Sequence, residues 1–236
     1  NLPGQYRDHK VQVGDQGHGG IYTPPKCKAD IDKLMKGFVE WINCTAVTGL
    51  DALIRASLAH YHLGLIHPFG NGNGRTIRII EALILKSAGV KFVPTMLSNY
   101  YYGHIDDYYR AFSFTRKNPE HDMTMFLKCM LEGVIDSLKE IKNTVTFSIR
   151  RLVMKDLLSS LKAGNSITQR QYELLCLLLE SGDTLTLKNL FNIGPYNTLY
   201  RNVSERTARR DLSKLAEMKL LTHNNGDYNL NLKALG

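Results

Sequence analysis

Cysteine is scarce in this sequence and is never closely paired. The four cysteines, Cys27, Cys44, Cys129 and Cys176, lie far apart, and none belongs to a CxxC motif. Zinc sites and disulfide frameworks need a recognisable cysteine spacing, so the sequence indicates neither. We expect reduced and mostly buried thiols that carry no function.

Long apolar runs are also missing, and we expect no secretory leader. The most apolar stretch, residues 79–93, is interrupted by Glu81, Lys86 and Lys91, so it does not reach the length of a membrane span. The 236 residues are 43% hydrophobic and 22% charged, which is ordinary for one large or two modest globular domains. We expect a cytoplasmic protein with no membrane contact.

Positive charge is in excess and is unevenly spread along the chain. The formal net charge is +8. Up to residue 145 the sequence has 17 Lys+Arg against 14 Asp+Glu, and after it 13 against 8, so the shorter C-terminal part is the more basic. Such an excess favours nucleic acid or acidic partners without specifying either.

One stretch, HPFGNGNGRTIR at residues 67–78, concentrates the chemistry of the chain. Its three alternating glycines lack a Cβ, so the backbone can turn successive N–H groups inward as an anion-binding nest. The stretch leads into an apolar helical pattern, whose N-terminus adds partial positive charge at the same point. Arg75 and Arg78 lie three residues apart on one face of the first turn, where both can hold phosphate oxygens. The sequence therefore predicts a loop that binds polyphosphate.

This stretch resembles the Fic-domain signature HPFx(D/E)GNGRxxR at every defined position except one, where Asn71 replaces an acidic residue. Fic proteins mostly transfer AMP from ATP to a hydroxyl side chain of a target protein. The resemblance implies a mainly α fold, a Fic-type helical bundle with a β-hairpin flap over the site. It also implies a protein adenylyltransferase (AMPylator) that uses ATP as substrate and Mg²⁺ as cofactor.

The resemblance assigns the chemistry to His67, as the general base that takes the proton of a Ser, Thr or Tyr hydroxyl during attack on the α-phosphate. Imidazole suits this step because its ordinary pKa lies near neutral pH. The residues implied to bind the nucleotide are Gly72, Asn73, Gly74, Arg75, Arg78, Tyr108 and Tyr109. For the two tyrosines, a place in the core is the alternative that their spacing leaves open.

A two-stranded ribbon is expected at residues 3–25, where weak apolar alternation surrounds several glycines before a proline pair. The matching segment of Fic proteins is the flap that positions the side chain to be modified. The flap positions implied here are Gly19, Gly20, Ile21 and Tyr22. An ordinary surface hairpin is the alternative.

Asn71 leaves the type of activity open. In the family the acid at this position ligates Mg²⁺, and the amide of Asn71 can replace it only as an uncharged, weaker ligand. Three alternatives follow: a slow AMP transferase capable of self-modification, an enzyme for another nucleotide or metal, or a nucleotide-binding regulator acting through its C-terminal part. The inhibitory pattern (S/T)xxxE(G/N) of Fic proteins is not found, since the nearest match, residues 213–218, lacks the final Gly or Asn.

Residues 1–145 form the expected Fic domain. The apolar patterns predict helices at residues 30–43, 50–63, 76–88 and 123–141. Trp41 is expected in the core, and the helix at 76–88 is apolar on most faces, as in a central helix surrounded by others. His60 and His62 point about 200° apart on a helix, so we expect packing or surface roles rather than a shared metal.

The sequence after residue 145 predicts a second, small winged-helix domain of α+β type at residues 146–236. A linking helix is expected at 147–161, three further helices at 168–179, 186–191 and 204–218, and a hairpin turn at Asn225-Gly226. Ser204 is a natural N-cap of the third helix. The candidates for DNA contacts in its opening turns are Arg206, Thr207, Arg209 and Arg210. Protein binding or a homodimer contact is the alternative role of this domain.

Overall fold

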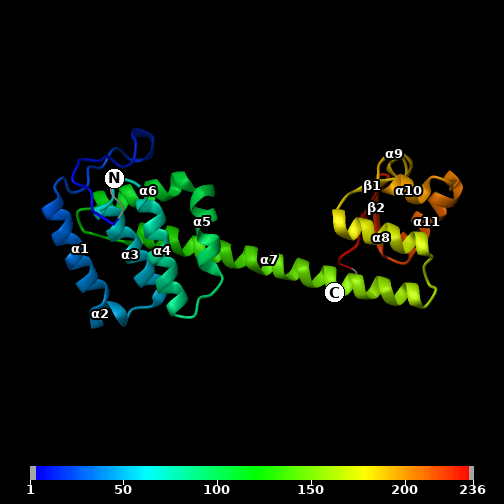
Figure 1. Cartoon of the computed structure of the whole chain (residues 1–236), viewed down its shortest axis with the longest axis horizontal. Helices are drawn as coiled ribbons and strands as arrows, with labels where there is room; N and C mark the ends of the chain where they lie inside the picture. Colours follow the sequence, from blue (N-terminus) through cyan, green and yellow to red (C-terminus); the bar gives the residue numbers. More distant parts are fainter. Residues whose placement is uncertain (1–3, 234–236) are drawn as a thin grey trace. The chain divides into compact units, whose positions relative to one another are not determined.

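The computed structural model describes residues 4–233, and the chain divides into two compact units, Asn1–Lys142 and Asn143–Gly236 (Figure 1). Residue 3, where the expected flap begins, lies outside the described residues. Helices dominate, and the named strands of the described chain form one small antiparallel sheet in the C-terminal unit. The predicted fold class is confirmed. None of the described helices is both long and apolar enough to cross a membrane.

The N-terminal unit is a helical bundle built around α3. Its helices are α1 (Lys28–Ile42), α2 (Thr45–Thr48), α3 (Ala52–Ile66), α4 (Asn73–Ser87), α5 (Val93–Gly103), α6 (Ile105–Lys117) and the first part of α7 (Thr124–Ala163). Small residues of α3, among them Ala56, Ala59 and Gly64, are buried and let neighbouring helices approach closely. Phe126 and Met130 of α7 are fully enclosed in the same core.

The helix α4 is less enclosed than its sequence predicts. Ile77 and Leu85 are buried, but Ile79 and Leu83 are each 60% exposed. The prediction of a helix surrounded by others is therefore wrong for α4. The apolar residues of α4 spread over more than one face, and its main packing partners are α3 and α5.

Two of the four thiols lie at helix starts rather than in the core. Cys27 and Cys44 occupy the N-cap positions of α1 and α2 and are exposed, whereas Cys129 is buried and Cys176 is half-buried. The prediction of mostly buried thiols is wrong for the first two, because an N-cap residue at the end of a surface helix faces solvent.

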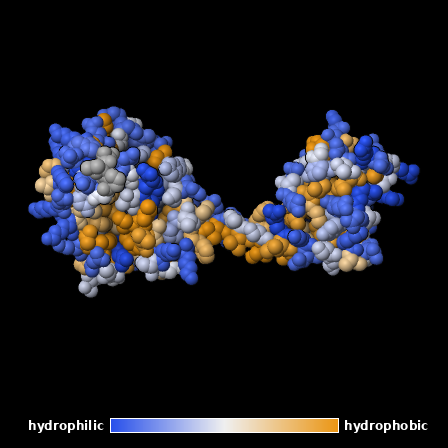
Figure 2. Space-filling view, in the orientation of Figure 1, coloured by the Kyte–Doolittle hydropathy of each residue, from blue (hydrophilic) through white to orange (hydrophobic). Residues whose placement is uncertain are grey.

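A single continuous helix, α7, replaces the two helices expected at 123–141 and 147–161. The junction at residues 142–146 contains no Gly or Pro, so nothing there interrupts the helical hydrogen bonds. Figure 2 shows apolar side chains along the middle of α7, where Val145 is 50% and Ile149 is 54% exposed.

The C-terminal unit combines helices with a three-stranded antiparallel sheet of order β1-β3-β2. Its further elements are α8 (Gln169–Ser181), β1 (Leu185–Thr186), α9 (Asn189–Asn192), α10 (Tyr196–Tyr200), α11 (Glu205–Glu217), β2 (Leu221–Asn224) and β3 (Asp227–Leu230). The Ser204 side chain caps α11, as the sequence predicts. Asn225 and Gly226 have positive φ angles of 50° and 88°, which fit the predicted tight turn between β2 and β3. The helix expected at 186–191 is shorter and is followed by the unexpected α10.

Candidate active site

A cavity of about 170 Å³ opens where the end of α3, the start of α4 and the helix α6 meet. Five residues predicted from the sequence line it: His67, Gly74, Arg78, Tyr108 and Tyr109. Val13, from the segment expected to form the flap, lines it as well. Typical ligand pockets measure about 300–1,000 Å³, so this cavity can enclose only part of a nucleotide. The roles of these residues stay predictions, but the fold places the five together.

His67 ends α3 in an unusual backbone conformation. Its φ and ψ angles are 47° and 59°, in the left-handed region that residues with a side chain seldom occupy, and its N–H donates to the carbonyl oxygen of Leu63 at 2.9 Å. Burial lowers the pKa of His67, and the positive charge of Arg7 lowers it further, while a backbone hydrogen bond with Gly64 acts in the opposite sense. A lowered pKa keeps the imidazole neutral at pH 7, which is the form a general base needs.

The loop between α3 and α4 is held by Asn73. The Asn73 side chain is 3% exposed, accepts from the N–H of Phe69 at 2.9 Å and donates to the carbonyl oxygen of Phe69 at 2.7 Å. Gly72 then starts α4 with a positive φ of 85°. A Cβ on Gly74 would lie 3.2 Å from the Arg78 guanidinium, so glycine leaves that side chain its room. Both polar ends of Asn73 serve the loop, which favours an orienting role over a direct phosphate contact.

The two arginines of the motif occupy different surroundings. Arg78 lines the cavity, and its guanidinium lies 5.5 Å from the ring centre of Tyr102. Arg75 is exposed and does not line the cavity. The sequence places both on one turn of α4, but only Arg78 reaches the space beside His67.

Asn71 lies outside the cavity. It is exposed and lines a separate hollow of about 490 Å³ together with residues 4–9 and Thr76. Its side-chain oxygen accepts from the N–H of Gly72 at 2.7 Å. Within residues 4–233, no group of three or more His, Cys, Asp or Glu side chains could hold a metal ion. The donor that Asn71 offers is therefore one neutral oxygen, which fits Mg²⁺ only if phosphates and water supply the other ligands.

A buried polar network that the sequence analysis missed borders the cavity. Glu81 is 3% exposed and lies 3.0 Å from Nδ1 of His60, and it accepts from the Tyr101 hydroxyl at 2.7 Å. Nε2 of His60 lies 3.1 Å from the Tyr108 hydroxyl. Burial and the neighbouring Glu81 raise the pKa of Tyr101. His60 therefore packs, as predicted, but it also fixes the position of a cavity tyrosine.

The expected flap is mostly irregular rather than a two-stranded ribbon. One bridge pair joins Val13 and Tyr22, and the residues between them include the short 3-10 helix η1 (Gln16–His18). The Tyr22 hydroxyl donates to the carbonyl oxygen of Leu65 at 3.0 Å. The ribbon prediction fails because the glycine-rich residues between the bridged positions do not alternate as strands do.

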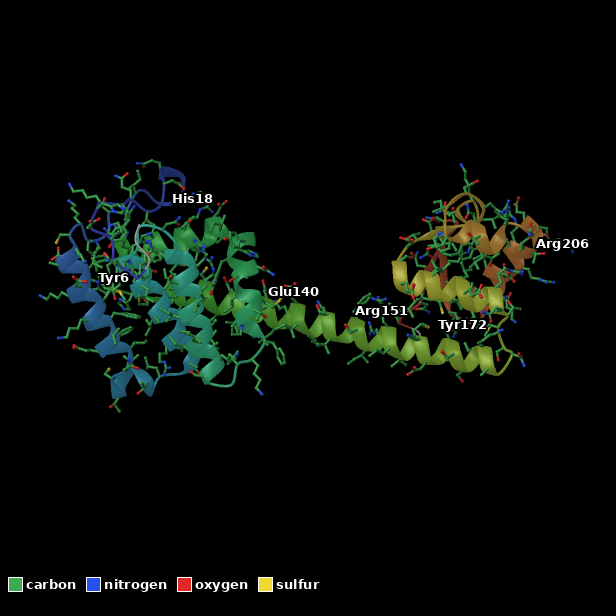
Figure 3. All side chains as sticks on the ribbon, viewed as in Figure 1. Tyr6, His18, Glu140, Arg151, Tyr172 and Arg206 are labelled. Carbon is green, nitrogen blue, oxygen red and sulfur yellow. The ribbon has the colours of Figure 1, made fainter. Side chains whose placement is uncertain are left out.

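Contacts with α6 hold the tip of this segment. His18, labelled in Figure 3, lies 2.8 Å from Asp106 and 2.8 Å from Asp15. Ser113 donates to the carbonyl oxygen of Gly19 at 2.8 Å, and a Cβ on Gly19, whose φ is 96°, would lie 2.5 Å from that hydroxyl. Gly19 is thus required for a close contact. Gly20 also has a positive φ of 90°, and its N–H donates to the carbonyl oxygen of Asp15 at 2.8 Å, whereas Ile21 is 46% exposed.

The helix α11 presents basic side chains to solvent. Arg206, Arg209 and Arg210 are exposed, and Arg206 points away from the unit in Figure 3. Arg209 forms an ion pair with Glu205 at 2.6 Å. Ion pairs on the surface are weak, so this one leaves Arg209 able to bind another partner. The fourth candidate, Thr207, lies 3.0 Å from the hydroxyl of the capping serine and is half-buried.

Buried Asp211 fixes α11 against α8. Its side chain accepts from Arg170 at 2.7 Å and from Gln171 at 2.9 Å, and it is 4% exposed. This attachment orients the exposed arginine face of α11 outward.

Comparisons with known proteins support both units. The Fic/DOC family pattern matches residues 1–85, and the DeoR-like helix-turn-helix domain pattern matches residues 170–233. "Protein adenylyltransferase fic-1" of Caenorhabditis elegans is 39% identical over 82 residues, which cover 35% of this chain and 16% of that protein. "Protein adenylyltransferase Fic" of Drosophila yakuba is 39% identical over 101 residues, which cover 42% of this chain and 19% of that protein. The matched part of the chain thus spans less than a fifth of these relatives.

A crystal structure of a Fic family protein from Desulfovibrio desulfuricans G20 shares the fold. Its TM-score is 0.52 at 22% identity, and the match covers 98% of this chain and 63% of that one. Together with the motif at residues 67–78, the family matches assign a Fic-type domain to residues 1–85 and a DeoR-like helix-turn-helix domain to residues 170–233.

Proposed function

We propose that this chain is a protein adenylyltransferase, which transfers AMP from ATP to a Ser, Thr or Tyr hydroxyl of a protein target. The observation that carries the proposal is the cavity in which His67 meets Gly74 and Arg78 at the N-terminus of α4. A base next to a helix N-terminus and a guanidinium suits attack by a hydroxyl on a phosphate. Relatives that are named adenylyltransferases favour the same activity. The free thiols also suit a cytoplasmic protein.

In this proposal each residue of the site has one task. His67 accepts the proton of the target hydroxyl as its oxygen bonds to the α-phosphorus, and pyrophosphate leaves. The N–H group at Gly74 and the guanidinium of Arg78 hold the phosphates, while Gly72, whose N–H donates to Asn71, shapes the loop. Such positioning supplies most of the acceleration in phosphoryl-type transfer. Arg75 does not line the cavity, so it holds only those phosphate oxygens of ATP that extend out of it.

The remaining predicted residues surround this centre. Tyr108 and Tyr109 contact the nucleoside across the cavity, and residues 19–22 of the flap hold the target segment. Asn73 orients the loop through Phe69. Mg²⁺ neutralises phosphate charge when bound, with Asn71 as a weak protein ligand beside phosphate oxygens and water.

The experiment that tests the proposal is intact-mass analysis of the purified chain after incubation with ATP and Mg²⁺. A mass increase equal to AMP, together with label transferred from α-labelled ATP, supports adenylyl transfer and self-modification. Labelling from γ-labelled ATP only would assign a different transferred group. ATP binding without any label, on this chain or on proteins of a cell extract, would favour a nucleotide-binding regulator.

We expect Asn71→Asp to saturate at a several-fold lower Mg²⁺ concentration than the native chain and to label faster. The substitution adds a charge without changing side-chain size, and Mg²⁺ prefers anionic oxygen ligands. A Mg²⁺ titration of the labelling rate measures both quantities, with Asn71→Ala as the variant that removes the ligand. Equal or slower labelling of the aspartate variant at saturating Mg²⁺ would contradict a transferase weakened at this position.

A second function, DNA binding, is favoured by the exposed arginines of α11. We expect the triple substitution of Arg206, Arg209 and Arg210 by alanine to weaken binding to mixed duplexes and to reduce the salt slope of log K by about 2–3, since each phosphate contact contributes about 0.9. Mobility shifts over a salt series measure this. A triple alanine substitution of Lys26, Lys28 and Lys36 removes equal charge from the other unit and should leave the slope unchanged. No binding by the native chain at low salt would assign the domain to protein contacts.

A further inference from the structure

Arg7 lies in the N-terminal segment, sixty residues before His67, yet it is bonded to the His67 turn. Its Nε donates to the carbonyl oxygen of His67 at 2.8 Å, and its backbone N–H donates to the carbonyl oxygen of Pro68 at 2.9 Å. A third bond, from Nη1 to the carbonyl oxygen of His9 at 2.8 Å, braces the guanidinium. The whole residue is 3% exposed. One buried arginine therefore holds both carbonyl groups that follow the imidazole.

These hydrogen bonds from Arg7 act on a part of the backbone that has an unfavourable conformation. A histidine with a φ of 47° occupies a strained conformation that persists only when its surroundings enforce it. The φ angle of His67 sets the direction of its Cα–Cβ bond relative to α3, so a turn held at this φ also fixes where the imidazole starts. Next along the chain, the ring of Tyr6 packs 5.8 Å from the ring of Phe69, which adds an apolar contact to the same attachment. Residues 6–9 thus brace residues 67–69 from outside the helical bundle.

The guanidinium also contributes charge beside the imidazole. Within the described chain the ionisable groups that share the cavity with His67 are His60, Arg78, Tyr101, Tyr108 and Tyr109. Burial is the largest cause of the lowered pKa of His67, and Arg7 is the charge that lowers it further. Removing this charge should therefore raise the pKa of His67, so that more of the imidazole is protonated in weakly acidic solution.

We infer that Arg7 is a positioning residue for His67: it fixes the backbone turn that carries the imidazole and keeps a positive charge beside it. The inference rests on the proposed function only in giving His67 the role of base. It predicts two separable effects, because lysine at position 7 keeps the charge but loses the forked geometry, whereas glutamine loses both.

The test follows His67 by NMR in the full chain labelled with ¹⁵N-histidine, with His67→Ala providing the assignment. In Arg7→Gln the titration midpoint of His67 should move upward and the His67 backbone N–H signal should shift. In Arg7→Lys the midpoint should stay near that of the native chain, while the backbone signal shifts. Arg55→Gln, which removes a partly buried arginine of the same bundle, is the matched control and should change neither.

The same variants are then assayed for transfer. We expect Arg7→Lys to lower kcat about tenfold or more with the KM for ATP unchanged, since a misplacement near 1 Å can cost about a hundredfold. Arg7→Gln should lose further activity in weakly acidic solution and regain part of it as the pH rises. If the native chain transfers nothing, the proposed function fails, but the NMR result still decides the role of Arg7.

Three results would overturn the inference. One is an unchanged His67 midpoint and backbone signal in Arg7→Gln. Another is native kcat in both Arg7 variants, and the third is an effect on the KM for ATP alone. Should Arg7→Gln fail to fold, as thermal unfolding would show, Arg7→Lys carries the test, because its predicted loss of kcat and shifted backbone signal do not depend on removing the charge.

Discussion

His67→Ala is expected to lower AMP transfer by at least a hundredfold while leaving the affinity for ATP within about twofold of the native chain. General base catalysis contributes about 10²–10⁴-fold, and that contribution is confined to the chemical step. Arg78 lines the cavity at the start of α4 and is proposed to hold the phosphates, so Arg78→Ala should show the opposite behaviour, a loss of ATP affinity. Transfer of α-label and titration calorimetry with ATP measure the two quantities.

Arg75→Ala is a useful control for this pair, because Arg75 is on the same turn but does not line the cavity. Its effect on ATP affinity should be smaller than that of Arg78→Ala. A histidine variant that no longer binds ATP, or an Arg78 variant that binds it as well as the native chain, would contradict the roles proposed here.

The parts of the fold that sequence predicts well are those with a local signal. Ser204 caps α11, and the Asn225-Gly226 turn joins two strands, because each signal acts within three or four residues. The continuity of α7 was not predictable in this way. The junction has neither a helix-breaking Gly or Pro nor a strong apolar pattern, so its sequence favours neither one helix nor two. Whether the helix continues there depends on the packing on either side of the junction.

In the candidate site, too, the features with a local sequence signal were predictable and the others were not. The motif at residues 67–78 puts base, loop and arginine within one short stretch, so their proximity follows from the sequence. The fold had to show that Arg78 rather than Arg75 enters the cavity, and that Asn71 faces a different hollow. At the start of a helix, a shift of one residue turns each side chain by about 100°, so it decides which arginine enters the cavity. The sequence of a glycine-rich loop does not predict where the helix after it begins.

Residues that contact each other from distant positions in the sequence show no spacing pattern by which the contact could be predicted. Arg7 meets His67 from sixty positions away, and Glu81 meets His60 from twenty-one. One signal was present for Glu81, a single acid within the apolar stretch at residues 79–93. This acid argues against a membrane span. A lone carboxylate on an apolar helix also indicates a buried partner, since an unpaired buried charge is strongly unfavourable.

That buried carboxylate leads to the largest expected effect on stability. We expect Glu81→Ala to lower the free energy of unfolding of the N-terminal unit by about 3–5 kcal/mol, because a buried network that loses one partner leaves its other polar groups unpaired. The substitution leaves Nδ1 of His60 and the hydroxyl of Tyr101 without their acceptor in surroundings that exclude water. Glu81→Gln keeps the volume and one acceptor oxygen, so its cost should be smaller, about 1–3 kcal/mol. Denaturant unfolding followed by circular dichroism measures both values.

The same variants separate stability from ligand binding. His60 also contacts the Tyr108 hydroxyl, 3.1 Å from its Nε2, so loss of Glu81 frees both rings and should weaken ATP binding even where the unit remains folded. Glu132→Ala is the matched control, because Glu132 is exposed and its ion pair with Lys128 spans 4.0 Å, a geometry worth less than about 0.5 kcal/mol. If Glu81→Ala unfolds no more easily than Glu132→Ala, the carboxylate does not stabilise the core through His60 and Tyr101. If it is unstable yet binds ATP like the native chain at low temperature, Tyr108 does not need this network to contact the nucleotide.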